Sequence, residues 1–214
     1  LSIARTVLKK NYAFEQYACD LTDIDSLQTT IQEIFSHFDP ATTSKLYLIN
    51  NAGDLGTVNT LDQIKAERIN YTIQLNLIAP MILNSQFIKL AANFPCEKKI
   101  INISSGAAIN PYESWSMYCS SKAGLDMMTK VIAKEQKEVK YGVASVSIYP
   151  GIVDTEMQTA ARTTPKEHFK AVQRFIDFHK NGQLATPEQV AQKIFQLNEA
   201  GVLKNGRILD VRDF

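Results

Sequence analysis

The sequence predicts one α/β domain in which a parallel sheet is covered by helices on both faces, a doubly wound arrangement. The first observation is that short apolar runs alternate with amphipathic stretches along the 214 residues. The second is that 45% of the residues are apolar and 21% are charged, a composition that buries one core and argues against disorder. The third is that no repeat or linker divides the chain, so residues 1–214 are expected to form a single domain.

The first elements are two strands and a helix. Short strands are expected over residues 1–4 and 14–18. A helix follows, with Thr22 or Asp23 able to cap its start, because apolar residues then recur at helical spacing. These residues are Leu27, Ile31, Ile34, Phe35 and Phe38.

The middle of the chain continues the alternation. Residues 46–49 are a short apolar strand that stops at the turn signal of residues 50–53. A long helical pattern covers about residues 63–92 and is expected to be interrupted at Pro80. Residues 100–103 then form another buried strand.

The last third contributes two strands and two helices. A helix is predicted over about residues 117–137 and a strand over 143–149. Residues 152–186 are a polar, partly helical excursion, in which about 152–184 is expected to act as a substrate lid. A final helix begins at the cap Thr186, and residues 206–211 close the chain as a strand.

Composition excludes several classes of function. The net charge of +1 argues against nucleic acid as a partner. The three cysteines and three histidines show no metal-ligand spacing, so we expect no metal site and a reducing, cytoplasmic location. No apolar run approaches the roughly 18 to 20 residues that span a bilayer, so a membrane partner is not expected. A hydrolase is not supported either, since the Gly-x-Ser-x-Gly motif is absent.

Ligands of doubly wound sheets bind beyond the carboxyl ends of the strands, so those positions were searched for chemistry. They hold Arg5, Asp20-Leu21, Asn51-Ala52-Gly53, Ser104-Ser105 and Pro150-Gly151. Tyr118 and Lys122 lie four residues apart on the predicted helix and share one face, which by itself also suits a solvated surface pair. Ser105, thirteen residues before the tyrosine, makes the set chemically interesting.

This set resembles the short-chain dehydrogenase/reductase family, over essentially the whole chain and in the same order. The matching pieces are Asn50-Asn51-Ala52-Gly53, Asn76, Ser104-Ser105, Tyr118-Cys119-Ser120-Ser121-Lys122 and Pro150-Gly151-Ile152-Val153-Asp154-Thr155. The resemblance implies a Rossmann-type fold, an NAD(P) cofactor and a small-molecule carbonyl or alcohol substrate.

The resemblance also implies catalytic roles for four residues. Tyr118 gives a proton to the carbonyl oxygen, and Ser105 donates a hydrogen bond to the same oxygen. Lys122 lowers the pKa of Tyr118 and holds the nicotinamide ribose. Asn76 keeps a water behind the lysine for proton relay, although by itself it also suits a helix surface.

The implied cofactor is NADP. Relatives that use NADP place a basic residue where Arg5 ends the first strand, and a guanidinium suits the 2′-phosphate. A solvated arginine is the alternative. The other implied contacts are Asp20 and Leu21 to adenine, Asn51, Ala52 and Gly53 to the adenosine ribose, and Pro150, Gly151, Val153 and Thr155 near the nicotinamide.

One departure from the family is its glycine-rich turn, Thr-Gly-x-x-x-Gly-x-Gly, which is absent. We expect that this turn and the central strand leading into it precede Leu1 in a longer protein. The pyrophosphate contacts therefore have no counterpart in this sequence.

Within the family the chain resembles the sepiapterin reductase and benzil reductase branch. That resemblance implies reduction of a ketone, a vicinal dicarbonyl or a pterin side chain, with Ser105, Tyr118 and Gly151 at the substrate. Asp210 would anchor an amino-pterin ring, or else is an ordinary surface aspartate. Tyr112, Trp115, Met157 and Phe169 could form an aromatic pocket or be plain packing. A non-catalytic, NADP-sensing module is the alternative function.

Two further expectations concern motion and assembly. Residues 160–165 are small and polar and are expected to be a weakly packed hinge leading to an amphipathic helix. That helix carries Phe169, Val172, Phe175, Ile176 and His179. A homodimer or homotetramer is expected through the long helices, whose apolar excess comprises Met127, Met128, Val131 and Ile132.

Overall fold

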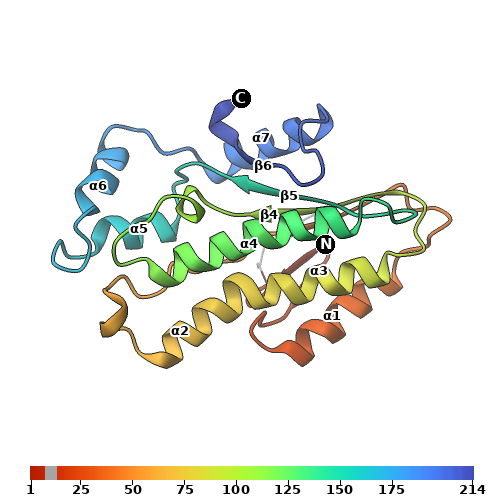
Figure 1. Ribbon diagram of the computed structural model, residues 1–214, viewed down its shortest axis with the longest axis horizontal. Helices are drawn as coiled ribbons and strands as arrows, with labels where there is room; N and C mark the ends of the chain where they lie inside the picture. The colour runs from red at the N-terminus through yellow and green to blue at the C-terminus, as the bar shows by residue number, and fades with distance from the viewer. Residues whose placement is uncertain (8–13) are drawn as a thin grey trace.

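The computed structural model describes residues 1–7 and 14–214 and shows parallel strands alternating with helices (Figure 1). The strands are β1 (Ser2–Ala4), β2 (Gln16–Ala18), β3 (Lys45–Asn50), β4 (Glu97–Ile103), β5 (Ala144–Tyr149) and β6 (Ile208–Asp210). The helices are α1 (Ile24–Ser36), α2 (Ala66–Ile73), α3 (Ala79–Leu90), α4 (Ser116–Glu135), α5 (Glu156–Thr163), α6 (Val172–Lys180) and α7 (Pro187–Glu199). The predicted doubly wound α/β class is confirmed.

The strands form two parallel sheets instead of the single sheet that the sequence predicts. One contains β3, β4, β5 and β6 in that order, and β1 pairs with β2 in the other. In the larger sheet Ile49 is level with Ile101, and Ile101 with Val146. The two sheets are not hydrogen-bonded to each other because no described strand lies between β1 and β3.

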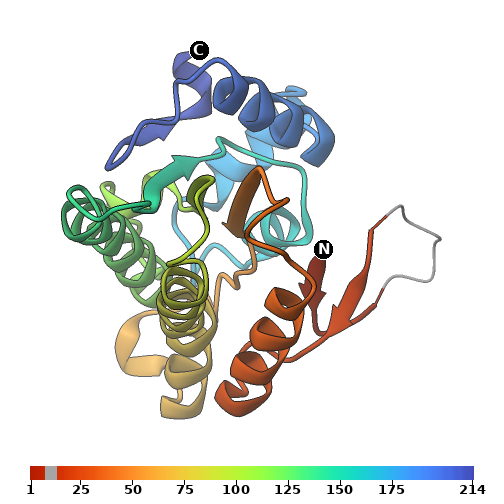
Figure 2. The same cartoon turned by 90° about the vertical axis from the view of Figure 1, so that its right-hand side faces the viewer.

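Alternation along β3 and β4 divides the side chains between two cores. Leu46 and Ile100 pack with Phe87 of α3 on one face, whereas Ile101 packs with Leu197 of α7 on the other. Figure 2 shows α1, α3 and α4 on one side of the sheet and α7 on the opposite side. The α7 side is covered only in part by the described residues, since Ile49 and Phe195 are 55% and 64% exposed.

Local capping signals set the starts of α1 and α7. Asp23, not Thr22, caps α1 by accepting a hydrogen bond from the N–H of Ser26. Thr186 starts α7 with a complete capping box. The interruption expected at Pro80 lies instead at residues 74–78, a π-helical turn. Pro80 falls in the first turn of α3, where its missing N–H is tolerated.

The excursion after β5 folds into α5 and α6 beyond the carboxyl ends of the strands (Figure 1). Ala161, within the expected hinge, is buried, and Phe169 has no exposed surface. The expectation of weak packing is therefore wrong at Ala161, which joins the aromatic cluster around Trp115, whereas Phe169 packs there as an apolar residue and precedes α6. No helix within the described ranges is long and apolar enough to cross a membrane.

Candidate active site

The carboxyl ends of β3, β4 and β5 open into a cavity of about 1070 Å³. It collects most of the predicted site residues: Asn51, Gly53, Ser105, Trp115, Tyr118, Lys122, Pro150, Gly151, Val153, Thr155, Met157 and Asp210. The predicted residues outside its lining are Arg5, Asp20, Leu21, Ala52 and Asn76. Parallel strands bring distant segments of the chain to one edge of the sheet, which is why residues from 51 to 210 meet here.

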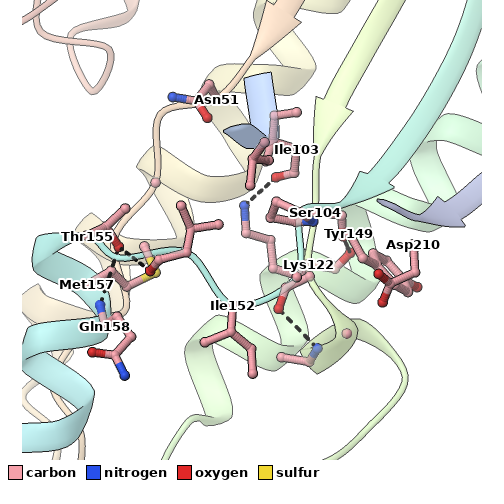
Figure 3. Close-up of a pocket in the computed structure, with 18 of the residues that line it drawn as sticks. Asn51, Ile103, Ser104, Lys122, Tyr149, Ile152, Thr155, Met157, Gln158 and Asp210 are labelled. Atoms are coloured by element: carbon pink, nitrogen blue, oxygen red, sulfur yellow. Dashed lines mark hydrogen bonds between the residues drawn. The ribbon is translucent and has the colours of Figure 1, made fainter. Parts of the chain in front are cut away.

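Tyr118 and Lys122 project from the buried face of α4, one helical turn apart. The Lys122 Nζ donates a hydrogen bond of 2.8 Å to the carbonyl oxygen of Ile103 at the end of β4 (Figure 3). The same nitrogen lies 5.7 Å from the centroid of the Tyr118 ring. The helix therefore places a phenol and an ammonium side by side at the cavity wall.

Burial sets the acid–base properties of this pair. Desolvation raises the pKa of Tyr118, against a smaller lowering by the Ser105 hydroxyl. Desolvation also lowers the pKa of Lys122 to about 8, although the Asp126 carboxylate opposes that shift. The largest influence on the pKa of Tyr118 is therefore loss of water, and the lowering that the resemblance assigns to Lys122 together with an oxidised cofactor stays a prediction. The tyrosine is a protonated donor at neutral pH.

Ser105 follows β4 and begins a short 3₁₀ helix, Gly106–Ala108. Its Oγ accepts a 3.1 Å hydrogen bond from the N–H of Ala107, which fixes the side chain as a cap. The hydroxyl proton stays available, and the influence of Ser105 on the pKa of Tyr118 places the two hydroxyls together. Two O–H donors thus converge on one part of the cavity, as activation of a carbonyl oxygen requires.

Asp126 is a buried carboxylate that sequence analysis missed. It lies on α4 one turn beyond Lys122 and accepts hydrogen bonds of 2.6 Å from Ser147 Oγ and from the Tyr149 hydroxyl. Short O–H donors to a carboxylate are typical of charge-assisted bonds. The eight-residue spacing from Tyr118 was the only available signal, and it indicates a shared helix face without indicating partners on β5.

Asn76 occupies the π-helical turn and is almost fully buried. Its Oδ1 accepts from the N–H of Asp54 at 2.8 Å, and its Nδ2 donates to the Asp54 carbonyl at 2.7 Å and to Ser121 Oγ at 3.2 Å. The side chain therefore joins the loop after β3 to α4. This places it behind the site, where its hydrogen bonds position the loop.

The backbone of the same loop passes close to Lys122, where a dinucleotide cofactor would bind. A Cβ added at Gly53 would lie 3.5 Å from Asn76 Oδ1 and 3.6 Å from Lys122 Nζ. The backbone at Gly53 thus passes directly over the lysine, and a side chain would occupy that space. Lys122 on one side and Val153 and Thr155 on the other would hold the nicotinamide half of NAD or NADP, while Asn51 and Gly53 line the cavity on the way to the adenosine ribose.

Residues expected at the adenosine end lie near the ends of β1 and β2. Arg5 is exposed, and its Nη1 donates to the Tyr71 hydroxyl at 3.2 Å. Asp20 accepts from the N–H and the hydroxyl of Thr22, and these bonds, with a smaller contribution from Arg5, lower its pKa. Arg5 and Asp20 are therefore close together, Leu21 follows Asp20 after β2, and Ala52 follows β3.

An aromatic wall faces the catalytic groups. Trp115 stacks between Tyr112, at 4.8 Å between ring centroids, and Phe169, at 5.1 Å. Because Phe169 is fully buried, it supports Trp115 from behind and does not line the cavity. Phe175 and Phe178 of α6 do line it, and their role in the wall was not predicted. The site is thus suited to a planar, aromatic substrate.

Comparisons with known proteins identify the family of this fold and site. A model of the short chain dehydrogenase family matches residues 2–166. The chain is 39% identical over 195 residues to a benzil reductase ((S)-benzoin forming) of Bacillus cereus, covering 91% of this chain and 78% of that protein. It is 31% identical over 201 residues to the sepiapterin reductase of Xenopus laevis, covering 92% and 73%.

Solved structures agree with these relatives. The KRED1-Pglu enzyme superposes with a TM-score of 0.77 at 30% identity, covering 91% of this chain and 78% of that one. A short chain dehydrogenase/reductase of Saccharomyces cerevisiae gives a TM-score of 0.80 at 22% identity, covering 98% and 83%, which supports the fold alone.

The fold and site define a Rossmann-type oxidoreductase that acts on carbonyl or alcohol groups. The chain belongs to the short chain dehydrogenase family, whose members use NAD or NADP.

Proposed function

We propose that this protein is an NADPH-dependent carbonyl reductase that reduces one ketone of a vicinal dicarbonyl to the alcohol. The observation that carries the proposal is that Ser105, Tyr118 and Lys122 line one cavity together with an aromatic wall. The likeness to benzil reductases of Bacillus cereus and Bacillus subtilis, at 39% and 37% identity, supports a diaryl diketone as the substrate class.

The chemistry follows from the positions of the hydroxyl groups. Ser105 and Tyr118 bind the carbonyl oxygen and polarise the bond, so negative charge that develops on the oxygen is stabilised. A bound nicotinamide cofactor supplies the hydride that the carbonyl carbon accepts. Tyr118 then transfers its phenolic proton to the oxygen, which completes the alcohol. The Lys122 ammonium stabilises the resulting phenolate until solvent returns a proton.

Preference for NADPH is proposed from Arg5. It is an exposed cation at the end of β1, beside Asp20, the residue that the resemblance places at the adenine. A guanidinium donates two parallel hydrogen bonds to a phosphate, so this position favours a 2′-phosphorylated adenosine.

Replacement of Tyr118 by Phe tests the catalytic assignment. The variant keeps the ring contact with Trp115 but lacks the proton, so kcat with benzil and NADPH is expected to fall by roughly 10²- to 10⁴-fold. NADPH binding and the melting temperature should change little. Retention of more than half of the turnover would contradict the role of Tyr118.

A substrate panel tests the function itself. Benzil, a simple aryl ketone and sepiapterin are each assayed with NADPH and with NADH, and the highest kcat/KM is expected for benzil with NADPH. A folded protein that binds NADPH and reduces none of these carbonyls would instead match a non-catalytic, NADP-sensing module.

A further inference from the structure

Asp210 is engaged by a side chain two residues further along. Its Oδ1 accepts from the backbone N–H and from Nε of Arg212, both at 2.9 Å, and its Oδ2 accepts from Nη2 at 2.5 Å. These bonds lower the pKa of Asp210 and raise that of Arg212. The result is a bidentate ion pair in which both carboxylate oxygens already have donors.

The ion pair lies in the wall of the cavity that holds the proposed catalytic groups. Asp210 and Arg212 line the same cavity as Ser105 and Tyr118. A Cβ added at Gly151 would lie 3.2 Å from Cδ and 3.3 Å from Cγ of Arg212. The aliphatic stem of the arginine therefore rests on Gly151, the glycine that directly follows β5 and Pro150.

Arg212 has hydrogen-bond donors that Asp210 does not use. A guanidinium has five N–H groups, of which two point at Asp210. Nη1 makes no hydrogen bond to any residue in the described ranges 1–7 and 14–214, and the side chain is 60% exposed. Because Asp210 fixes the planar fork, these donors are held in one orientation before a ligand arrives.

We propose that Arg212 is a specificity-determining residue that donates a hydrogen bond to the second, non-reacting oxygen of a vicinal dicarbonyl. This inference rests on the proposed function and adds the group that distinguishes a diketone from a simple ketone. The same ion pair withdraws Asp210 from the amino-pterin contact that the resemblance implies, because an incoming amine meets a carboxylate whose charge is already balanced.

The test uses two substrates that differ in one oxygen. Benzil has two adjacent carbonyls, and deoxybenzoin has the same two phenyl rings with one carbonyl replaced by methylene. Arg212→Met keeps an aliphatic stem over Gly151 but has no donors. We expect it to lower kcat/KM for benzil by about ten- to hundredfold, and to change kcat/KM for deoxybenzoin less than threefold.

Arg174→Met is the matched control. Arg174 lines the same cavity and is exposed, but its Nη1 reaches the Tyr112 hydroxyl at 3.4 Å and it rests on the Phe178 ring. Arg174→Met removes the same positive charge from the cavity wall, but Arg174 is not proposed to contact the second carbonyl. The ratio of kcat/KM for benzil to kcat/KM for deoxybenzoin is therefore expected to stay unchanged. An equal loss for both substrates in Arg212→Met, or no loss for either, would overturn the proposal.

A binding readout separates this inference from the proposed reaction. Trp115 is the single tryptophan, and it forms part of the cavity wall, so quenching of its fluorescence reports ligand binding without turnover. The dissociation constant for benzil should rise in Arg212→Met and that for deoxybenzoin should not. If the dissociation constants change in this way but the wild-type protein reduces no carbonyl, the proposed reaction is refuted and the role of Arg212 is sustained.

The affinity for sepiapterin is expected to change in the opposite direction to that for benzil. Removing the guanidinium frees Asp210, so Arg212→Met should lower the dissociation constant for sepiapterin, and a second change, Asp210→Asn, should abolish the gain. Unchanged sepiapterin binding in Arg212→Met would contradict the idea that the ion pair withholds Asp210.

Discussion

Two buried ionisable side chains, Tyr118 and Lys122, set the pH range of the chemistry. Lys122 is charged below its pKa of about 8, and its charge stabilises the phenolate that remains after proton transfer. As pH rises through about 8 the ammonium is lost, so kcat/KM for ketone reduction should fall. Because kcat/KM reports groups of the free enzyme, its pH profile measures this limb directly.

Asp126→Asn should move that limb to lower pH. The Asp126 carboxylate raises the pKa of Lys122, so its neutralisation lowers the pKa and the fall in kcat/KM begins earlier. Tyr149→Phe is the control, because it removes one hydrogen bond to Asp126 and keeps the negative charge. If the pH profile of kcat/KM shifts equally in both variants, packing and not the Asp126 charge controls the pKa of Lys122.

Arg5→Asp should shift the cofactor preference toward NADH. The change replaces an attraction for the 2′-phosphate with a repulsion, and charged hydrogen bonds of roughly 1.5 to 3 kcal/mol correspond to about ten- to hundredfold in the NADPH/NADH ratio of kcat/KM. Arg5→Gln removes the charge alone and should give a smaller shift. If the NADPH/NADH ratio of kcat/KM is the same in both variants as in wild type, Arg5 does not contact the 2′-phosphate.

At the scale of elements, we propose that α5 and α6 form the segment that covers the nicotinamide. Gln158 of α5 donates to the carbonyl of Phe175 in α6 at 3.0 Å, and Thr155 caps α5 from the cavity side. The two helices are therefore joined to each other. Phe169, stacked on Trp115, ties the segment between them to the aromatic wall.

NADPH is expected to increase the hydrogen-exchange protection of residues 157–180. A joined helix pair beside the cofactor groups Val153 and Thr155 closes as one unit and excludes water before hydride transfer. Helix α7 serves as an internal reference whose protection should stay constant. Equal protection of residues 157–180 with and without NADPH would show that these helices are a static cover.

At the scale of the whole molecule, we propose a homodimer or homotetramer formed through α3 and α4. Met127 and Val131 are one turn apart on α4 and are 59% and 44% exposed, and Met81 of α3 is 48% exposed. Ile132 and Met128 do not add to this face, since Ile132 is buried and the Met128 sulfur accepts a hydrogen bond from Asn84. The apolar face is thus smaller than the sequence predicts.

Analytical ultracentrifugation tests the assembly. Wild type should sediment at the mass of two or four chains at micromolar concentration, and Val131→Glu should shift it toward one chain by placing a charge in the interface. Ile109→Glu alters a more exposed apolar residue, in the turn after β4 and outside the Met127 and Val131 face, and should leave the mass unchanged. A wild-type protein that sediments as one chain would contradict the proposal.

Local patterns were sufficient for the α/β class, the order of elements and the pairing of Tyr118 with Lys122. The caps at Asp23 and Thr186 and the alternation along β3 are properties of neighbouring residues, so they can be recognised without knowing the fold. Tyr118 and Lys122 share a face because a helix repeats every 3.6 residues. Strand ends were recognisable as ligand positions because parallel strands converge at one edge.

Only the tertiary structure decided which of these groups act together and in what state. Burial, which depends on packing between elements, raises the pKa of Tyr118, and no local pattern predicts that increase. The partners of Asp126 lie on β5, and the fixed orientation of Arg212 depends on both Asp210 and the bare surface of Gly151. Such contacts join side chains from different elements, and the free energy of an ionised group depends on them and on the water they exclude. No periodicity along the chain encodes that environment.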